Sequence, residues 1–324
     1  MNPNEVPNSN TPDYKNNQTE DHELAHLYRE LVALVRELIN SKKIDKPRIE
    51  NILDKIVNIF LQKPFNELLL YMYSISKDNY IIGHIANCVI LSIGFAVSLG
   101  FKKEEVLDVG LVAFCHDFGM MEYTELFQKA LQLTPAENEV IRQHPLKSAD
   151  MFRPYFSEKI INGILDIHEC VNGGGYPKGK TGTEISLLAK VVSICDVYEA
   201  LSHPRSFRKE FIPYECMKTV IKKKDTLFDK RVVKKFLEFM SIFPIGSLVY
   251  INTEETGMVI KSNLGFPTRC IVRVLLNAKR EIEQSGKAIN LLDDPMVHII
   301  GPVKANEEQE ILHFLKPRGD YESF

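Results

Sequence analysis

The sequence predicts a mainly helical protein, in which a helical bundle is preceded by a helical lead-in and followed by a small all-β domain. Apolar residues recur at helical spacing from residue 22 to residue 62. Helical patterns continue from residue 80 to about residue 240, where no alternating strand pattern occurs. After residue 243, short β-branched runs appear, separated by Gly, Asn, Asp and Pro.

The composition narrows the class of protein. The chain has 324 residues, which suggests two domains and a tail, and its net charge of -3 gives no sign of a general DNA- or RNA-binding protein. Its six cysteines form no CxxC pair and most lie in apolar runs, as in the reduced core of a cytosolic protein. We therefore predict a cytoplasmic protein without a thiolate-rich zinc site.

The first 76 residues divide into a polar tail and the helical lead-in. Residues 1–21 are rich in Asn and Pro and lack the apolar core of a signal peptide, so we expect them to be disordered. Residues 22–43 and 47–62 each carry a helical apolar stripe, and a third apolar stretch follows Pro64. Two interpretations of residues 22–76 stay open: a bundle for sensing or for homodimerisation, or extra helices packed on the following domain.

The next domain is expected to span residues 77–243 and to be helical throughout. Its predicted helices are 80–99, 103–115, 124–131, 135–151, 157–168, 186–201, 212–223 and 229–240. Thr134 and Pro135, followed by Glu137, are typical of a helix start with a cap and a first-turn proline.

One apolar run, residues 80–101, has the length of a membrane span. His84 and Asn87 lie about one turn apart near its start, and ionisable residues inside a membrane are rare without a function. We therefore predict a buried core helix rather than a span. Beyond the helical domain, residues 244–303 predict a small, barrel-like all-β domain, and residues 304–324 a charged helix or tail.

Several polar residues fall on or beside the apolar helices. Five histidines between residues 84 and 203 occupy different helices or loops: His84, His116, His144, His168 and His203. Asp117 follows His116, and Asp196 ends an apolar run, where a buried carboxylate is costly unless it is paired or bound to metal. Singly, such histidines are usually core or surface residues. Together, they match a metal site built from facing helices of a bundle.

Two further stretches could contact a ligand. Asn172-Gly173-Gly174-Gly175-Tyr176-Pro177 combines glycines, which allow close approach of the backbone, with a tyrosine ring. Arg205-Ser206-Phe207-Arg208-Lys209 places cations around an aromatic residue, and Arg suits phosphate groups. The alternatives are a plain turn for the first stretch and a solvated charge run for the second.

These residues, in this order, resemble the HD-GYP subgroup of the HD-domain metal-dependent phosphohydrolases. The match runs from about residue 80 to residue 210 and rests on His84, His116-Asp117, Gly119, His144-Pro145, His168-Glu169, Gly175-Tyr176-Pro177, Asp196, Ala200, Arg205 and Arg208. The C-terminal β domain is similar, more weakly, to a small domain sometimes appended to this family.

The resemblance implies an all-helical core that hydrolyses cyclic di-GMP to the linear dinucleotide pGpG, and in some members on to GMP. It also implies two divalent metal ions, usually iron or manganese. By position, one ion would be held by His84, His116, Asp117 and Asp196. Asp117 would bridge to a second ion that His144 and His168 complete, and His116 and Asp117 would be the catalytic pair.

The resemblance assigns further roles around this centre. Glu169 would be a partner that orients a metal ligand. Contacts with the substrate would come from Gly175, Tyr176, Pro177, Arg205 and Arg208.

Four positions depart from the family pattern. Met120 stands in place of a Lys, Ile167 in place of the first His of a His-His-Glu stretch, and Asn172 in place of a loop Asp. Tyr80 stands where three-metal members carry a Glu, so a third metal is not expected. A fifth change, Glu199 for Asp, keeps the charge.

These departures leave two functions open. The first is a working cyclic di-GMP phosphodiesterase with a two-metal site. The second is a weak or inactive relative that binds cyclic di-GMP or a partner protein and signals through its helical lead-in.

Overall fold

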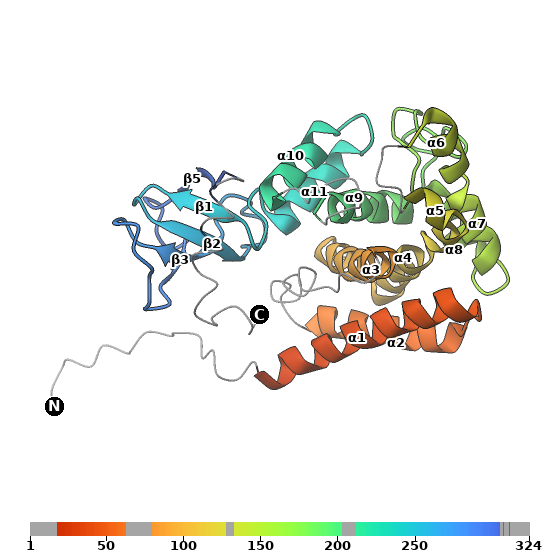
Figure 1. Ribbon diagram of the computed structural model, residues 1–324, viewed down its shortest axis with the longest axis horizontal. Coiled ribbons are helices and arrows are strands. Elements are labelled where there is room, and N and C mark those ends of the chain that lie inside the picture. The colour runs from red at the N-terminus through yellow and green to blue at the C-terminus, as the bar shows by residue number, and fades with distance from the viewer. Residues whose placement is uncertain are drawn as a thin grey trace.

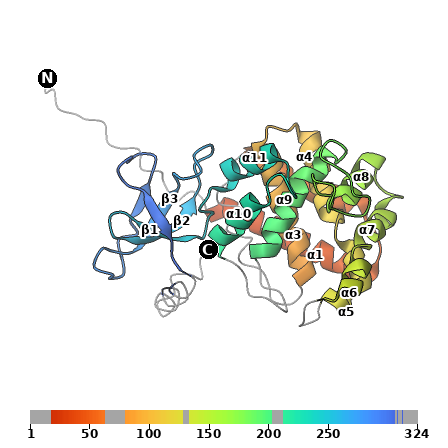
Figure 2. The same cartoon turned by 90° about the horizontal axis from the view of Figure 1, so that it is seen from above.

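The computed structural model describes residues 18–62, 80–127, 133–202 and 212–304, together with residues 307 and 311. Figure 1 shows a body of helices at one end of the molecule and a small β-sheet at the other. Helices α10 (Pro213–Lys222) and α11 (Lys230–Met240) lie between the sheet and the other helices in both views (Figures 1 and 2). The predicted fold class, mainly helical with an all-β unit after the bundle, is confirmed.

Helix α3 (Tyr80–Ser98) is the centre of the helical body. Every residue from Ile81 to Ala96 is buried, because this helix is apolar on all sides. It packs on α4 (Lys103–Cys115) and α9 (Leu187–Ser202). Within the described ranges, α3 is the one helix long and apolar enough to cross a membrane, yet 89% of its most apolar window is buried in the protein. The predicted core helix is therefore confirmed.

Helices α1 (Gln18–Ser41) and α2 (Lys46–Gln62) form the lead-in. They pack on each other and on α3 and α4, and their buried side chains, such as Leu31 and Leu53, belong to the main hydrophobic core. This arrangement supports the second interpretation of the lead-in, as helices packed on the following domain. A homodimer through these helices stays a prediction.

The boundary of the N-terminal tail needs a correction. Residues 18–21 were expected to be disordered but form the first turn of α1, because the helical pattern extends one turn further towards the N-terminus. Residues 1–17, and the apolar stretch that follows Pro64, lie outside the described residues.

The short helices between α4 and α9 surround one face of the bundle. They are η2, a 3-10 helix (Phe118–Tyr123), α5 (Thr124–Phe127), α6 (Pro135–Ile141), α7 (His144–Phe152) and α8 (Glu158–Asp166). The single helix predicted over 135–151 is wrong, because the chain breaks between α6 and α7. Pro145 explains the break: it has no N–H to donate to the carbonyl of Ile141, and its ring would clash there. The predicted cap at Thr134 is present, with its side chain accepting from the Glu137 amide.

The C-terminal strands form one antiparallel sheet in the order β4-β3-β2-β1-β5. They are β1 (Leu248–Ile251), β2 (Thr256–Lys261), β3 (Ile271–Leu276), β4 (Ala288–Asn290) and β5 (Ile299–Pro302). We did not predict β4, which is only 3 residues long and mostly accessible to solvent. Because the pairings leave β4 and β5 at opposite edges, these strands form an open sheet rather than the barrel-like closure that we expected.

Candidate metal centre

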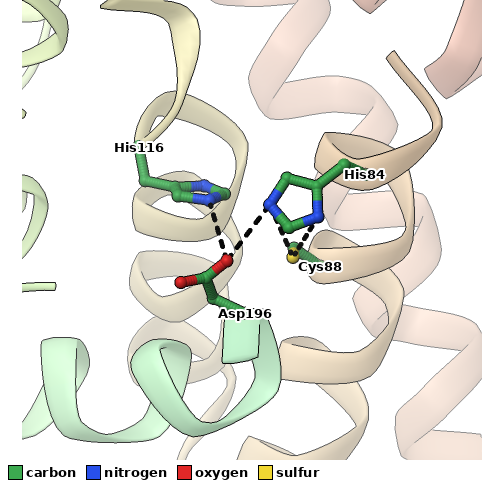
Figure 3. Close-up of side chains that lie close together, drawn as sticks. All are labelled: His84, Cys88, His116 and Asp196. Carbon is green, nitrogen blue, oxygen red and sulfur yellow. Dashed lines mark hydrogen bonds and ion pairs between the residues drawn. The ribbon is translucent and has the colours of Figure 1, made fainter. Parts of the chain in front are cut away.

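Helices α3, α4 and α9 bring polar side chains together inside the apolar core (Figure 3). His84 comes from α3, His116 directly follows α4, and Asp196 lies on α9; all three are buried. The Asp196 Oδ1 atom lies 3.1 Å from His84 Nε2 and 3.9 Å from His116 Nε2. Three potential ligands therefore face one small space.

Asp117 lies between this group and a second one. Its Oδ2 atom is 3.3 Å from His84 Nε2, and its Oδ1 atom is 3.2 Å from His144 Nε2. Helix α4 ends at Cys115 and η2 begins at Phe118, so His116 and Asp117 occupy the junction between two helices. Adjacent residues on a continuous helix would point about 100° apart, but at this junction both can serve one site.

The second group consists of Asp117, His144 and His168. His144 begins α7, and His168 follows α8. Their Nε2 atoms lie only 2.8 Å apart. Two nitrogens at this distance require a shared proton or a cation between them, because two lone pairs would repel each other.

The histidine tautomers fit a metal centre. The Nδ1–H groups of His116 and His144 donate to the carbonyls of Ala113 and Ile141, each at 2.8 Å. The Ile141 carbonyl is available for this purpose because Pro145 cannot use it. In the neutral imidazoles both Nε2 atoms therefore carry lone pairs that point into the site, and His116 Nε2 is buried with no hydrogen-bond partner in the described structure. Metal-binding histidines usually have this pattern.

Glu199 orients the His84 ring, a role that we did not predict. Its carboxylate accepts from His84 Nδ1 and, at 2.8 Å, from Asn87 Nδ2. This fixes the His84 tautomer, with Nε2 facing Asp196 and Asp117. The spacing of Glu199 three residues after Asp196, on the same face of α9, was the signal in the sequence.

Glu169 accepts hydrogen bonds from backbone amides, and its predicted role as a partner that orients a metal ligand stays a prediction. Its two carboxylate oxygens accept hydrogen bonds from the Lys178 and Lys180 amides at 2.7 and 2.8 Å. It therefore holds the segment that directly follows the glycine-rich loop, residues 172–177. The loop itself folds back on His168, whose carbonyl accepts from the Tyr176 amide at 3.1 Å.

The loop positions Tyr176 beside the second group. The Tyr176 ring stacks on His168 with 5.0 Å between ring centroids, and the Arg142 guanidinium lies 5.2 Å from the Tyr176 centroid. Gly175 is required here: a Cβ atom at this position would lie 2.3 Å from the Cys170 amide nitrogen. The Tyr176 ring of the loop and the Arg142 cation at the end of α6 thus lie next to His144 and His168.

Charges in the site favour the metal-binding forms of Asp117, Asp196 and His168. Burial raises the pKa of the Asp117 carboxyl, but His116, His144 and His84 outweigh burial and hold that pKa well below its ordinary value. Burial likewise raises the pKa of Asp196, and His84 and His116 bring it below its ordinary value. Burial and the neighbouring His144 lower the pKa of His168 to about 4, so this imidazole is neutral at pH 7.

The positions that depart from the family pattern are also visible. Ile167 is buried in the hydrophobic core and Met120 packs against it, so neither supplies a polar group. The Asn172 side chain accepts from the Gly174 amide at 3.0 Å and shapes the loop. Tyr80 stacks on the His84 ring, with 5.3 Å between centroids. Arg205, Arg208 and His203 lie outside the described residues.

Two protein families match parts of this chain. The HD domain family matches residues 76–232, and the family described as a KOW domain associated with HD domain matches residues 248–311. A Pseudomonas aeruginosa protein named cyclic di-GMP phosphodiesterase PA4108 is 27% identical over 264 residues, 81% of this chain and 63% of its own length. A Borreliella burgdorferi protein named cyclic di-GMP phosphodiesterase PdeB is 24% identical over 209 residues, 64% of this chain and 55% of its own.

The chain thus spans less than two thirds of the length of either relative. Among solved structures, the fold is similar to that of Bd1817, an HDG"Y"P protein from Bdellovibrio bacteriovorus. The TM-score is 0.57 at 19% identity, covering 69% of this chain and 73% of the other.

Proposed function

We propose that this chain, an HD-domain protein of the HD-GYP type, is a metal-dependent phosphodiesterase that hydrolyses cyclic di-GMP to pGpG, with GMP as a further product. One observation carries this proposal: the six residues expected as ligands converge in two adjacent groups that share Asp117. The names of the two relatives support the substrate.

The donor set suits two divalent ions. His84, His116 and Asp196 would hold one ion, and His144 and His168 the other. Asp117 would bridge them, because one of its carboxylate oxygens faces each group. When bound, such ions supply Lewis-acid polarisation of a phosphoryl group and lower the pKa of water.

The protein's own groups would position the substrate and the ligands. Glu199 keeps His84 oriented, and the Ala113 and Ile141 carbonyls do the same for His116 and His144. The edge and hydroxyl of the Tyr176 ring would contact the substrate beside His168, and the Arg142 cation over the same ring suits a phosphate. The buried surroundings strengthen each charge interaction relative to water.

The alternative function rests on Ile167 and Met120. Because both side chains are apolar and packed in or against the core, the second group lacks one imidazole and the site lacks one cation. A loss of this kind costs on the order of 2–4 kcal/mol of transition-state stabilisation, by analogy with one oxyanion donor. The alternative is therefore a weak or inactive relative that binds cyclic di-GMP or a partner protein.

Purified protein separates the two functions. We expect about two ions per chain after anaerobic loading with Fe²⁺ or Mn²⁺, and pGpG on incubation with cyclic di-GMP. Asp117→Ala should abolish turnover, whereas Asp150→Ala, an exposed aspartate on α7, should not change it. Tight binding of cyclic di-GMP without product, in fully loaded protein, would reject the enzyme and favour the receptor.

The nucleotide specificity needs its own measurement. Cyclic GMP-AMP is a suitable competing substrate, because it differs from cyclic di-GMP in only one purine base. We expect faster turnover of cyclic di-GMP when both are supplied at equal concentration. The reversions Met120→Lys and Ile167→His then test the two departures, and each should raise turnover if its position limits the reaction.

A further inference from the structure

Cys88 lies beside His84, His116 and Asp196, which we call the first ligand group, although no metal role was expected for it. We propose that the Cys88 thiolate is a ligand of the ion held by His84, His116 and Asp196, and that it makes this position select Fe²⁺ or Zn²⁺ over Mn²⁺. The inference rests on the proposed metal centre and names the kind of ion that one half of it takes. It does not depend on which nucleotide is hydrolysed.

The helix geometry brings the sulfur to the site. Cys88 lies four residues after His84 on α3, so the two side chains share one face. Helical side chains lean towards the N-terminus, which carries the Cys88 sulfur back towards His84. The ligand atoms of His84, Cys88, His116 and Asp196 all lie within 4.8 Å of one another, and Figure 3 shows the four side chains converging.

A hydrogen bond to His84 does not account for the position of the sulfur. Cys88 Sγ lies 3.8 Å from both Nδ1 and Nε2 of His84, so it is directed at neither nitrogen. His84 Nδ1 already donates to Glu199, and Nε2 faces Asp196 and Asp117. The sulfur therefore lies beside the ring, at the edge of the space that the other ligand atoms face.

Core packing does not account for it either. Cys115, Cys195 and Cys216 are buried members of the main hydrophobic cluster, as expected of cysteines that act as small apolar residues. Cys88 is equally buried, with 0% of its surface exposed, but it is not part of that cluster. Its sulfur instead contacts the ring of His84, one of the candidate ligands.

Binding of the sulfur follows ordinary metal chemistry. The thiol S–H bond breaks, its proton passes to solvent, and the sulfur forms a bond to the ion through the electron pair left behind. A thiolate adds a soft donor to two imidazoles and a carboxylate. Mn²⁺ lies at the weak end of the affinity series for such sites, whereas Zn²⁺ and Fe²⁺ accept thiolate readily.

Cobalt(II) is a suitable probe, because a thiolate–cobalt bond gives a charge-transfer band in the near ultraviolet in addition to the visible d–d bands. We expect both features in the wild-type protein after anaerobic loading. In Cys88→Ser and Cys88→Ala the charge-transfer band should disappear while the d–d bands remain. Cys195→Ala is the matched control, a buried cysteine beside Asp196 but outside the group, and it should keep both features.

Metal competition gives a second measurement. We expect Cys88→Ser to weaken Zn²⁺ binding about 10–100-fold, as for loss of a group that supports a metal site, with a smaller effect on Mn²⁺. The wild type should also release one more proton per bound Zn²⁺ than Cys88→Ser.

The outcomes are distinct. Visible d–d bands without a charge-transfer band in the wild type, or a charge-transfer band that survives in Cys88→Ser, overturn the role of Cys88 and leave the metal centre intact. A protein that binds no cobalt overturns both the role of Cys88 and the proposed function.

Discussion

The Tyr28 hydroxyl donates a hydrogen bond of 3.1 Å to the side-chain oxygen of Asn87, and so joins helix α1 to helix α3 inside the core. The amide group of Asn87 donates to Glu199, which accepts from His84 Nδ1. Four buried polar groups thus lead from the helical lead-in to the first ligand group. Hydrogen bonds therefore connect the lead-in to the candidate metal centre.

Tyr28→Phe tests this connection. The substitution removes the donor to Asn87, and we expect a loss of about 1–3 kcal/mol in the free energy of unfolding. Urea unfolding of the metal-free protein measures this loss. Tyr155→Phe, at a side chain that is 39% exposed, is the control and should change stability little. Equal effects of the two substitutions would contradict a specific role for the Tyr28 hydroxyl.

Glu199→Gln tests the group that orients His84. The amide keeps the size of the side chain but removes the charge that holds the His84 Nδ1 proton, so we expect metal affinity to fall about 10–100-fold. Isothermal titration calorimetry with Zn²⁺ or Co²⁺ measures the change in metal affinity. Glu104→Gln, at an exposed position on α4, should leave affinity unaltered. If Glu199→Gln also leaves it unaltered, the hydrogen bond to His84 does not support the metal centre.

Gly175→Ala tests whether the close packing at Gly175 positions the Tyr176 ring. A Cβ atom would lie 2.3 Å from the Cys170 nitrogen and 2.5 Å from the Glu169 Cα atom, so the loop must move and carry the Tyr176 ring off His168. We expect a cost of about 1–3 kcal/mol in stability and a lower turnover of cyclic di-GMP. Thermal unfolding and product assays measure both.

The neighbouring glycine provides the control for this loop. At Gly174 the nearest atom to an added Cβ is the Asn172 side-chain oxygen at 3.2 Å, which can shift. Gly174→Ala should therefore be tolerated better. The same loss from both substitutions would show that the loop needs general flexibility rather than close packing at Gly175.

The helices were predictable where apolar periodicity decides their ends. The apolar run before Ser98 and the one before His116 define α3 and α4 to within a residue or so. The break between α6 and α7 is not visible in the apolar pattern, because the pattern continues through Pro145 while the missing Pro145 N–H leaves the Ile141 carbonyl without a helical donor. Strand β4 was missed because a short, mostly accessible strand leaves little apolar signal.

The ligand set was predictable in part. His84, His116, Asp117, His144, His168 and Asp196 carry the family pattern, and the fold brings them together. The groups around them were not predicted, because their roles depend on contacts between distant segments. Glu199 meets His84 across 115 residues, and Glu169 meets loop amides that no spacing rule predicts. Cys88 stands in an apolar run, where a cysteine usually is a core residue, so its place in the sequence does not indicate a metal ligand.

Metal affinity should depend on pH over an unusually high range. Burial lowers the pKa of both His84 and His144, but nearby groups, chiefly Cys88 for His84 and Asp117 for His144, outweigh burial and raise each pKa above its ordinary value. In the metal-free protein a proton therefore competes with the ion beyond pH 6.5, where an ordinary histidine is already half deprotonated. We expect affinity to keep rising with pH above 7, as measured by Zn²⁺ titration at several pH values.

The same shifts predict opposite trends in stability for the two forms of the protein. A histidine whose pKa is raised on folding stabilises the fold fully below its unfolded pKa of about 6.5, and this contribution is lost as pH rises through the folded value. The metal-free protein should therefore lose stability above pH 6.5, while the stabilisation by bound ion grows as fewer protons compete. Thermal unfolding of both forms from about pH 6 to pH 9 measures the difference in stability between the metal-bound and the metal-free protein. If the difference in stability between the two forms stays constant over this range, protons do not compete with the ion at His84 and His144, because metal and proton would then bind independently.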